Sequence, residues 1–425
     1  MIYIHVPFCR SFCTYCDFYS ELAGGCRGDG GLRQDYLLEA YTEALCAEIR
    51  ACGELVREQL CGAADGKLPV AGKCGTAGGV SPKTLYIGGG TPSLMPLEFF
   101  ERILAELRRV AGVSELDFEE FTVEVNPEDI IEKGAEYVRG LMALGVNRIS
   151  MGVQSFDDRI LGFMNRRHNA AKAKQAYEIL QQARVENISI DLIFGLPQLS
   201  EALWQDTIRQ SVALAPKHIS AYQLSIEPGS ALAEMVAKGK FVEAGQEECS
   251  RQYDILCEEL AAAGYNHYEI SNFARHGYEA VHNSAYWSHV PYLGLGPAAH
   301  SFLCGTDGKY VRLWNNADIK AYINASKTAA FDSVRGRETL TANELNEEKI
   351  MLALRTSEGI DAEYLRNHCK ASVLDRLLSH GLLEEIVCDG ALPEQASNGA
   401  ANKKSAFRIP EKHFFISDSI ITELI

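Results

Sequence analysis

The sequence contains no apolar run long enough to cross a bilayer, so no transmembrane segment is expected. Basic residues are scarce, because 41 Lys and Arg stand against 57 Asp and Glu, a formal charge of −16. This balance argues against broad nucleic-acid binding, which needs a basic face, but it leaves room for a local basic pocket. We therefore expect no nucleic-acid partner, while transient contact with a membrane surface is compatible with the sequence.

Cysteine is too sparse for a disulfide scaffold. The 13 cysteines are an odd number, and no signal peptide precedes them. Thiols of this kind indicate a reducing compartment, so we expect a cytoplasmic protein. The 425 residues allow two domains and a sizeable core, and the 47% hydrophobic content is ordinary for a globular protein.

Three cysteines nevertheless lie close together near the amino terminus. A strand-like segment, Tyr3–Phe8, runs into Cys9, Cys13 and Cys16 with C-x3-C-x2-C spacing. Thiolates this close together favour zinc, Cu(I) or an iron–sulfur cluster. Position 18 is Phe18, so no fourth ligand follows and one coordination position stays open, which usually indicates chemistry. A zinc site completed from elsewhere and a redox dithiol are the alternatives.

Strand-like and helix-like segments alternate further along the chain. Strands are predicted at 84–87, 121–125, 148–151, 188–193 and 218–224, and helices at 34–52, 96–110, 135–144, 170–183 and 202–214. With the first segment, the alternation predicts an α/β fold built on six strands, a partial (β/α)6 barrel. Active sites of such folds lie at the carboxyl ends of the strands.

The pattern breaks after the last of these strands. We expect residues 1–230 to form the core barrel and residues 231–335 an extension rich in His and aromatic residues. Residues 336–425 are expected to form a smaller, mainly helical C-terminal domain, with a winged-helix arrangement as one option. Helices are predicted at 246–262, from a capping box at Thr341 and Glu344 to about residue 355, and at 416–425. Residues 22–32 and 61–82 are predicted loops.

Residue types at the strand ends indicate what the site binds. Gly88–Gly90 allows close approach of the backbone to a ligand, or forms a tight turn. Glu124 and Asp191 lie in otherwise apolar strands, where a carboxylate is costly unless it is paired or hydrogen-bonded. Two such carboxylates suit a ligand with hydroxyl and ammonium groups, and a salt bridge inside the barrel is the alternative. Arg166 is a candidate partner for a ligand carboxylate, or a solvated surface residue.

The cysteine segment has an aromatic residue, Tyr15, directly before its last cysteine, and it resembles the signature of the radical S-adenosylmethionine (SAM) family. Together with Gly88–Pro92, Gly152–Phe156, Asn165-Arg166 and Asp191–Pro197, it resembles the oxygen-independent coproporphyrinogen III oxidase family. The resemblance implies a [4Fe–4S] cluster on Cys9, Cys13 and Cys16. The SAM contacts that it implies are Tyr3, Tyr15, Gly89, Gly90, Thr91, Glu124, Gln154, Arg166 and Asp191.

Two departures from the oxidases point to a different branch of that family. Phe18 stands at the position where the true oxidases share a fourth cysteine. The oxidases also carry an extension before the cluster cysteines, whereas only eight residues precede Cys9 here. Both features resemble the branch described as haem chaperones (HemW-like proteins), as does the segment His282–Trp287. This resemblance implies a carrier that takes haem as cargo and transfers it to an acceptor apoprotein.

Within that segment, His282 is a candidate axial haem ligand, with Tyr286 and Trp287 as flat apolar surface. The alternative is a hydrogen-bonded core histidine among aromatic residues. The alternative function is the oxidase reaction, in which SAM cleavage leads to oxidative decarboxylation of a porphyrinogen. Phe18 and the short amino terminus disfavour enzyme activity of that type. A zinc-stabilised barrel with an interaction domain is a third hypothesis, which metal content would separate from the others.

Overall fold

The computed structural model describes residues 1–23, 34–62, 81–305, 307–388 and 404–425. The loops predicted at 22–32 and 61–82 lie mostly outside these described residues. None of the helices within the described ranges is both long and apolar enough to cross a membrane.

One sheet organises the molecule, with the strand order β11-β1-β4-β5-β6-β7-β8-β10-β9. Its centre consists of six parallel strands, which confirms the predicted α/β fold. They are β1 (Ile2–Val6), β4 (Thr84–Gly89), β5 (Glu120–Val125), β6 (Arg148–Gln154), β7 (Asn187–Phe194) and β8 (His218–Gln223). No pairing joins β11 to β9 in the described sheet, so the barrel is open, as the prediction of a partial barrel implies.

Three short strands that the sequence did not reveal extend this sheet at its edges. β11 (Leu293–Leu295) pairs in parallel with β1, and β10 (Asn272–Ala274) with β9 (Asn266–Glu269) continues antiparallel from β8. Strands of three or four residues are too short to show a period of two. They come from the predicted extension at 231–335, so part of that segment completes the sheet. The proposed boundary at residue 230 stays a prediction.

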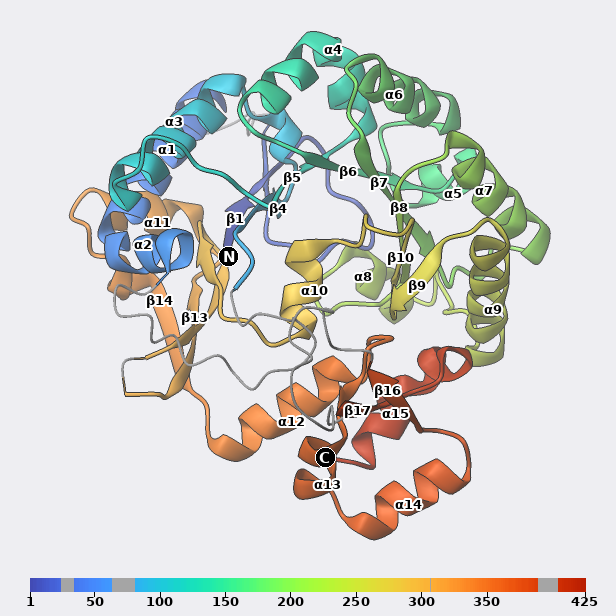
Figure 1. Ribbon diagram of the computed structural model, residues 1–425. Helices are drawn as coiled ribbons and strands as arrows, with labels where there is room; N and C mark the ends of the chain where they lie inside the picture. Colours follow the sequence, from blue (N-terminus) through green and yellow to red (C-terminus); the bar gives the residue numbers. More distant parts are fainter. Residues whose placement is uncertain (24–33, 63–80, 306, 389–403) are drawn as a thin grey trace.

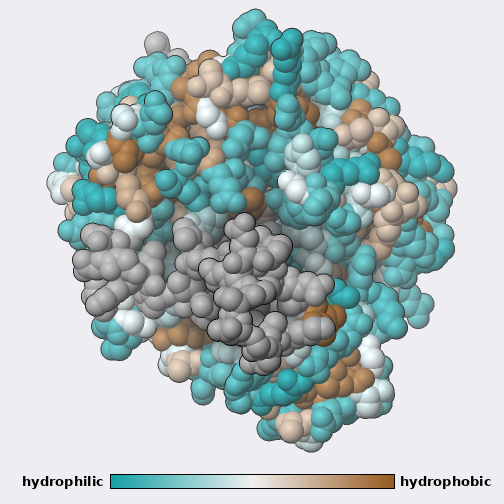
Figure 2. All heavy atoms as spheres, viewed as in Figure 1, coloured by the Kyte–Doolittle hydropathy of each residue, from teal (hydrophilic) through white to brown (hydrophobic). Residues whose placement is uncertain are grey.

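Helices form an arc around the parallel strands (Figure 1). They are α1 (Gln34–Ala51), α3 (Leu97–Ala111), α4 (Pro127–Ala143), α6 (Ala170–Gln182), α7 (Glu201–Leu214) and α9 (Gln246–Ala262). All were predicted, but α4 begins earlier than the predicted start at residue 135. It runs across a kink at Gly134, where φ is 69°, and the sequence pattern revealed only the part after this kink. The face shown in Figure 2 is mostly hydrophilic, with scattered apolar patches.

Side chains alternate along the parallel strands, because successive residues point to opposite faces. The face toward the helices is apolar and fully buried; it includes Leu85, Ile87, Val123, Ile149 and Ile190. The face toward the barrel interior is largely polar, and registered neighbours on it include Tyr86 with Thr122, Glu124 with Ser150, and Asp191 with Ser220. The helices therefore cover the apolar outer face of the sheet, while the polar side chains lie on its inner face.

A buried carboxylate joins the amino-terminal helix to the segment that follows the sheet. Glu48 of α1 accepts hydrogen bonds from Tyr322 Oη at 2.7 Å, Asn315 Nδ2 at 2.7 Å and the Gly296 amide at 2.8 Å, and it pairs with Arg335 at 2.5 Å. Burying a charge is costly without such partners. This network fixes the chain just beyond β11, and therefore supports β1 from its outer side.

Three smaller sheets lie outside the main sheet in the described residues, and the shortest pairs β2 (Phe8–Cys9) with β3 (Glu21–Leu22). The other two lie later in the chain. One sheet contains β12 (His300–Cys304), β13 (Tyr310–Asn315) and β14 (Arg335–Thr339), followed by α12 (Ala342–Ala353), whose capping box is confirmed. The C-terminal part adds α13 (Ala362–His368), α14 (Ala371–Ser379), α15 (Ser417–Thr422) and a small sheet of β15 (Ile360–Asp361), β17 (Lys404–Arg408) and β16 (Glu384–Cys388). The helix predicted at 416–425 is thus shorter than expected.

Candidate functional site

A cavity of about 880 Å³ opens at the carboxyl ends of the parallel strands. This volume lies near the upper end of the range for small-molecule sites, so the cavity has room for more than one small ligand. It brings together every predicted cluster and SAM residue except Tyr3: Cys9, Cys13, Tyr15, Cys16, Gly89, Gly90, Thr91, Glu124, Gln154, Arg166 and Asp191. Tyr3 lies behind Tyr86, with ring centroids 6.1 Å apart, and its hydroxyl hydrogen-bonds with His5.

The three cysteines lie on the loop that leaves β1, residues 9–20, which we call the cysteine loop. Thr91 donates a hydrogen bond to Cys9 Sγ at 3.4 Å, and Arg166 donates one to Cys13 Sγ at 3.5 Å. Burial raises the pKa of Cys9, and raises that of Cys16 to about 12. Every cysteine whose side chain the structure describes is a free thiol, so these three are available as ligands.

This donor set fits an iron–sulfur cluster. Sulfur is the ligand that such clusters require, and the three thiols share one cavity wall. Among the described residues, no three His, Cys, Asp or Glu side chains converge closely enough to hold a single metal ion. A cluster of several irons, in contrast, needs ligands that are spread around it. The three thiols stay candidate ligands of such a cluster.

The glycine run lies directly beneath the cysteine loop. The Gly90 amide donates to Val6 O at 2.8 Å, and a Cβ on Gly90 would lie only 2.7 to 2.8 Å from backbone atoms of Val6 and Phe8. Gly89 has φ of 104°, in the left-handed region, and a Cβ there would overlap the His5 ring. Glycine is therefore required by protein packing at both positions, and both still line the cavity.

Two half-buried carboxylates, Glu124 and Asp191, also line the cavity. Glu124 accepts hydrogen bonds from Tyr86 Oη at 2.7 Å and the Gly89 amide at 3.0 Å, while Ser150 Oγ lies 3.2 Å from both Asp191 oxygens. Burial raises the pKa of Glu124 to about 7 and that of Asp191 to about 6. Neither forms a salt bridge with any described residue. The predicted alternative, a salt bridge inside the barrel, therefore does not stabilise these carboxylates. A cationic ligand would stabilise their ionised form.

Arg166 is half-buried and hydrogen-bonded to protein groups, so it is not the solvated surface arginine of the alternative. Its Nη2 donates to Asn126 Oδ1 at 2.6 Å and Gly152 O at 2.7 Å, in addition to the contact with Cys13. It thereby joins the cysteine loop to the ends of β5 and β6. Gln154, at the end of β6, has φ of 68° next to a β-bulge. Positive φ is uncommon for a non-glycine residue, and such strained backbone occurs at functional sites more often than elsewhere.

The sequence analysis missed several residues that line the cavity. Tyr86, Ser150, Arg148, Ser220 and Tyr222 all project from the inner face of the parallel strands. Their common signal is alternation, because each stands an even number of residues from another inward side chain of its strand. Asn283, from α10 (Val281–Trp287), also lines the cavity.

The structure places His282 away from the cavity wall, inside the barrel, where α10 lies within the arc of strands (Figure 1). Its Nδ1 is 2.7 Å from Thr84 Oγ1 and its Nε2 is 2.9 Å from Tyr286 Oη. The residue is only 1% exposed, and burial lowers its pKa to about 3. In this arrangement both ring nitrogens are occupied, so a haem iron would have to displace one hydrogen bond. Haem contacts by His282, Tyr286 and Trp287 stay a prediction.

Comparisons with known proteins define the class to which this fold and site belong. Residues 77–210 match the Radical SAM superfamily. The fold is similar to the solved structure of coproporphyrinogen III oxidase (HemN) from Escherichia coli, with a TM-score of 0.70 at 21% identity, covering 99% of this chain and 88% of that chain. The protein is thus a radical SAM protein, a class whose cofactors are a [4Fe–4S] cluster and SAM.

The particular family follows from sequence relatives. Heme chaperone HemW of Bacillus subtilis is 33% identical over 84% of this chain and 84% of its own length. Heme chaperone HemW of Synechocystis is 32% identical over 89% of this chain and 84% of its own length. The chain belongs to the HemW family.

Gly90→Ala should displace the cysteine loop, because its Cβ would overlap the backbone of Val6 and Phe8. We expect a destabilisation of about 1–3 kcal/mol, typical of overpacking, together with less iron bound per chain after anaerobic reconstitution. Gly162→Ala in α5 (Asp158–Phe163) is the control, since nothing lies within 4 Å of its Cβ position. Iron content and urea unfolding measure both effects, and wild-type iron content in Gly90→Ala would contradict this account of the glycine run.

His282→Gln should destabilise the fold by about 1–3 kcal/mol, because the hydroxyls of Thr84 and Tyr286 lose a buried partner. The exposed His276→Gln is the matched control, with an expected change within about 0.5 kcal/mol. Urea unfolding followed by circular dichroism checks both variants. Equal stability of the two would show that the buried hydrogen bonds of His282 contribute little.

Proposed function

We propose that this protein is a cytoplasmic haem chaperone, which binds haem and passes it to an acceptor apoprotein. The observation that carries this proposal is the 33% identity to Heme chaperone HemW of Bacillus subtilis over 84% of the chain. The convergence of the cysteine loop with the polar strand ends in one cavity supports the cofactor part of the proposal.

In this proposal Cys9, Cys13 and Cys16 hold the [4Fe–4S] cluster. The predicted SAM contacts surround the same cavity, where Glu124 and Asp191 would accept hydrogen bonds from the hydroxyl and ammonium groups of SAM. Arg166, which still has guanidinium donors unused, would bind the carboxylate of SAM. A bound cluster supplies the electron that radical SAM chemistry requires.

The oxidase reaction is the alternative, but no contact in the cavity specifically favours it. The similarity to the Escherichia coli oxidase structure, at 21% identity, concerns the fold. Phe18 is 62% exposed and lines the cavity. It stands at the position where the oxidases share a cysteine. SAM cleavage with coproporphyrinogen as substrate would test this alternative directly.

Titration of anaerobically reconstituted protein with haem tests the proposed function. We expect a saturable shift of the Soret absorbance near one haem per chain. Transfer of that haem to an apoprotein acceptor should follow on mixing, as loss of the shifted band. Linear, unsaturable absorbance would contradict the chaperone function and would direct attention to the oxidase reaction.

SAM affinity should fall as the pH is lowered from 7.5 to 5.5. Burial holds the pKa of Glu124 near 7 and that of Asp191 near 6. A cationic ligand favours the ionised carboxylates, so binding is strongest above both pKa values and is lost as protons return. Below a given pKa, each carboxylate that must ionise costs about tenfold in affinity per pH unit. Equilibrium dialysis at each pH checks this.

The Glu124→Gln variant is the control for this pH dependence. It should bind SAM more weakly at pH 7.5, and its affinity should change less between pH 7.5 and 6.5 than that of the wild type. If the two profiles have the same slope, Glu124 does not control SAM binding.

A further inference from the structure

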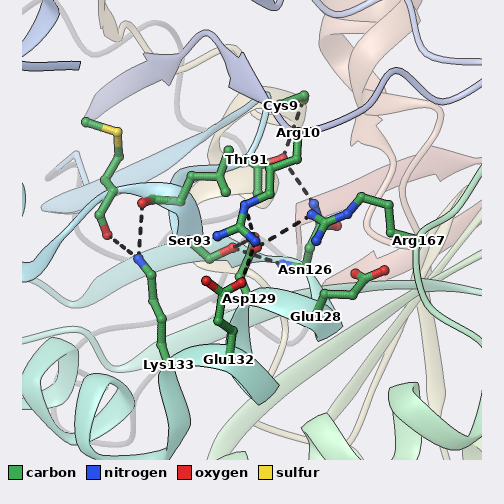
Figure 3. Close-up of polar contacts among 12 residues, drawn as sticks. Cys9, Arg10, Thr91, Ser93, Asn126, Glu128, Asp129, Glu132, Lys133 and Arg167 are labelled. Carbon is green, nitrogen blue, oxygen red and sulfur yellow. Dashed lines mark hydrogen bonds and ion pairs between the residues drawn. The ribbon is translucent and has the colours of Figure 1, made fainter. Parts of the chain in front are cut away.

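Among the described residues, four arginines line the cavity, and two of them are already neutralised by carboxylates. Arg10 pairs with Glu132, and Arg10 and Arg167 each lie 3.8 Å from Asp129 Oδ1 (Figure 3). The other two, Arg148 and Arg166, form no ion pair with any described residue. Arg166 is the residue proposed above for the carboxylate of SAM, which leaves Arg148 without an assigned partner.

Arg148 is the first residue of β6, and its side chain lies on the inner face of the barrel together with that of Ser150. The residue is only 3% exposed, and what remains accessible faces the cavity that it lines. Arg166, in contrast, is attached near the other end of the strand, where it donates to Gly152 O. The two arginines are therefore held at opposite ends of β6.

The hydrogen bonds of Arg148 leave most of its guanidinium unused. Its Nη1 donates to Asn187 Oδ1 at 2.9 Å and to Tyr278 O at 3.4 Å, and both acceptors are neutral. Its Nε and Nη2 donate to no described residue. Burying a charge without a counter-ion is costly. An anion that enters the cavity would therefore gain both a free pair of donors and a charge to neutralise.

The side chains around Arg148 do not compensate its charge. Burial lowers the pKa of His218 well below its usual value, so this imidazole is neutral, and its nitrogens bond to Ser189 Oγ and Tyr268 Oη. Asp191 lies beyond ion-pair distance from Arg148. Burial raises the pKa of Asp191 to about 6, whereas direct pairing with an arginine lowers the pKa of a carboxyl group.

A carboxylate suits this position better than a phosphate does. A guanidinium binds the planar carboxylate through paired hydrogen bonds. A phosphate group carries about two negative charges at neutral pH, and Arg148 alone would balance only one of them beside Glu124 and Asp191. The cavity, at about 880 Å³, has room for a second small ligand beside SAM.

We propose that Arg148 anchors a second binding subsite of this cavity, which takes an organic ligand through its free carboxylate. SAM occupies the part of the cavity next to the cysteine loop, and the carboxylate of the second ligand binds to Nε and Nη2 of Arg148. Two sources offer this chemistry: a propionate group of haem, and a separate small organic acid. The inference rests on the proposed haem-binding function in the first case and goes beyond it in the second.

Sodium propionate is the first probe, added to anaerobically reconstituted wild-type protein in the presence of SAM. We expect propionate to raise the midpoint of thermal unfolding by about 1–3 °C relative to sodium chloride at the same ionic strength, because a ligand of the native state stabilises it. Arg148→Gln should remove this difference. Equal midpoints of the wild type in propionate and chloride would overturn the inference.

Two further variants separate ligand binding from folding. Arg148→Lys keeps the charge but loses the paired donors, so it should weaken propionate binding roughly tenfold. Arg275→Gln is the matched control, because Arg275 also donates to a backbone carbonyl, Ala263 O, but lies outside the cavity, and its response to propionate should equal that of the wild type. Equilibrium dialysis should show unchanged SAM affinity in Arg148→Gln. A roughly tenfold loss of SAM affinity would overturn the inference, because Arg148 would then bind SAM itself.

Haem and haem dimethyl ester, which has no free carboxylates, identify the source of the carboxylate. If haem supplies it, Arg148→Gln binds haem roughly tenfold more weakly than the wild type does and binds the ester equally well. If a separate acid supplies it, both proteins bind haem with the same affinity while propionate still stabilises the wild type alone. Absence of haem binding by the wild type would overturn the proposed function, and the propionate experiment would still decide the role of Arg148.

Discussion

The site depends on the contact between Gly90 and the start of the cysteine loop. At this point β4 ends against the chain that leaves β1, and there is no space for a side chain between the two backbones. The hydrogen bond from the Gly90 amide to Val6 O fixes the direction in which the loop departs. Thr91, the next residue, then donates to Cys9. The close approach of these two backbones therefore places the cysteine loop over the carboxyl ends of the strands.

The barrel interior is built for ligands at some cost to stability. Polar and ionisable side chains on the inner face of the strands would be unfavourable in a dry core. Hydrogen bonds from Tyr86, Ser150 and the Gly89 amide offset part of this cost for Glu124 and Asp191. The apolar outer face, packed under the helices, and the buried network of Glu48 supply the stability that the interior does not.

Much of this arrangement could be predicted from the sequence. The alternation of strand-like and helix-like segments predicts the six parallel strands, and the cysteine spacing predicts the cluster ligands. The edge strands escaped detection because they are too short, and the first part of α4 because Gly134 interrupts the helix.

Whether Arg166 and His282 are exposed could not be inferred, because burial of a polar side chain depends on partners distant in the sequence. Asn126 and Thr84 are such partners.

The central claim is that one cavity holds both the cluster and SAM. Electron paramagnetic resonance of the reduced, reconstituted protein, recorded with and without SAM, tests this claim most directly. The account predicts the signal of a reduced [4Fe–4S] cluster, whose g-values change when SAM is added and which disappears in Cys13→Ala. A cluster signal that SAM leaves unchanged would contradict the account, because the cluster and the SAM contacts would then not share one site.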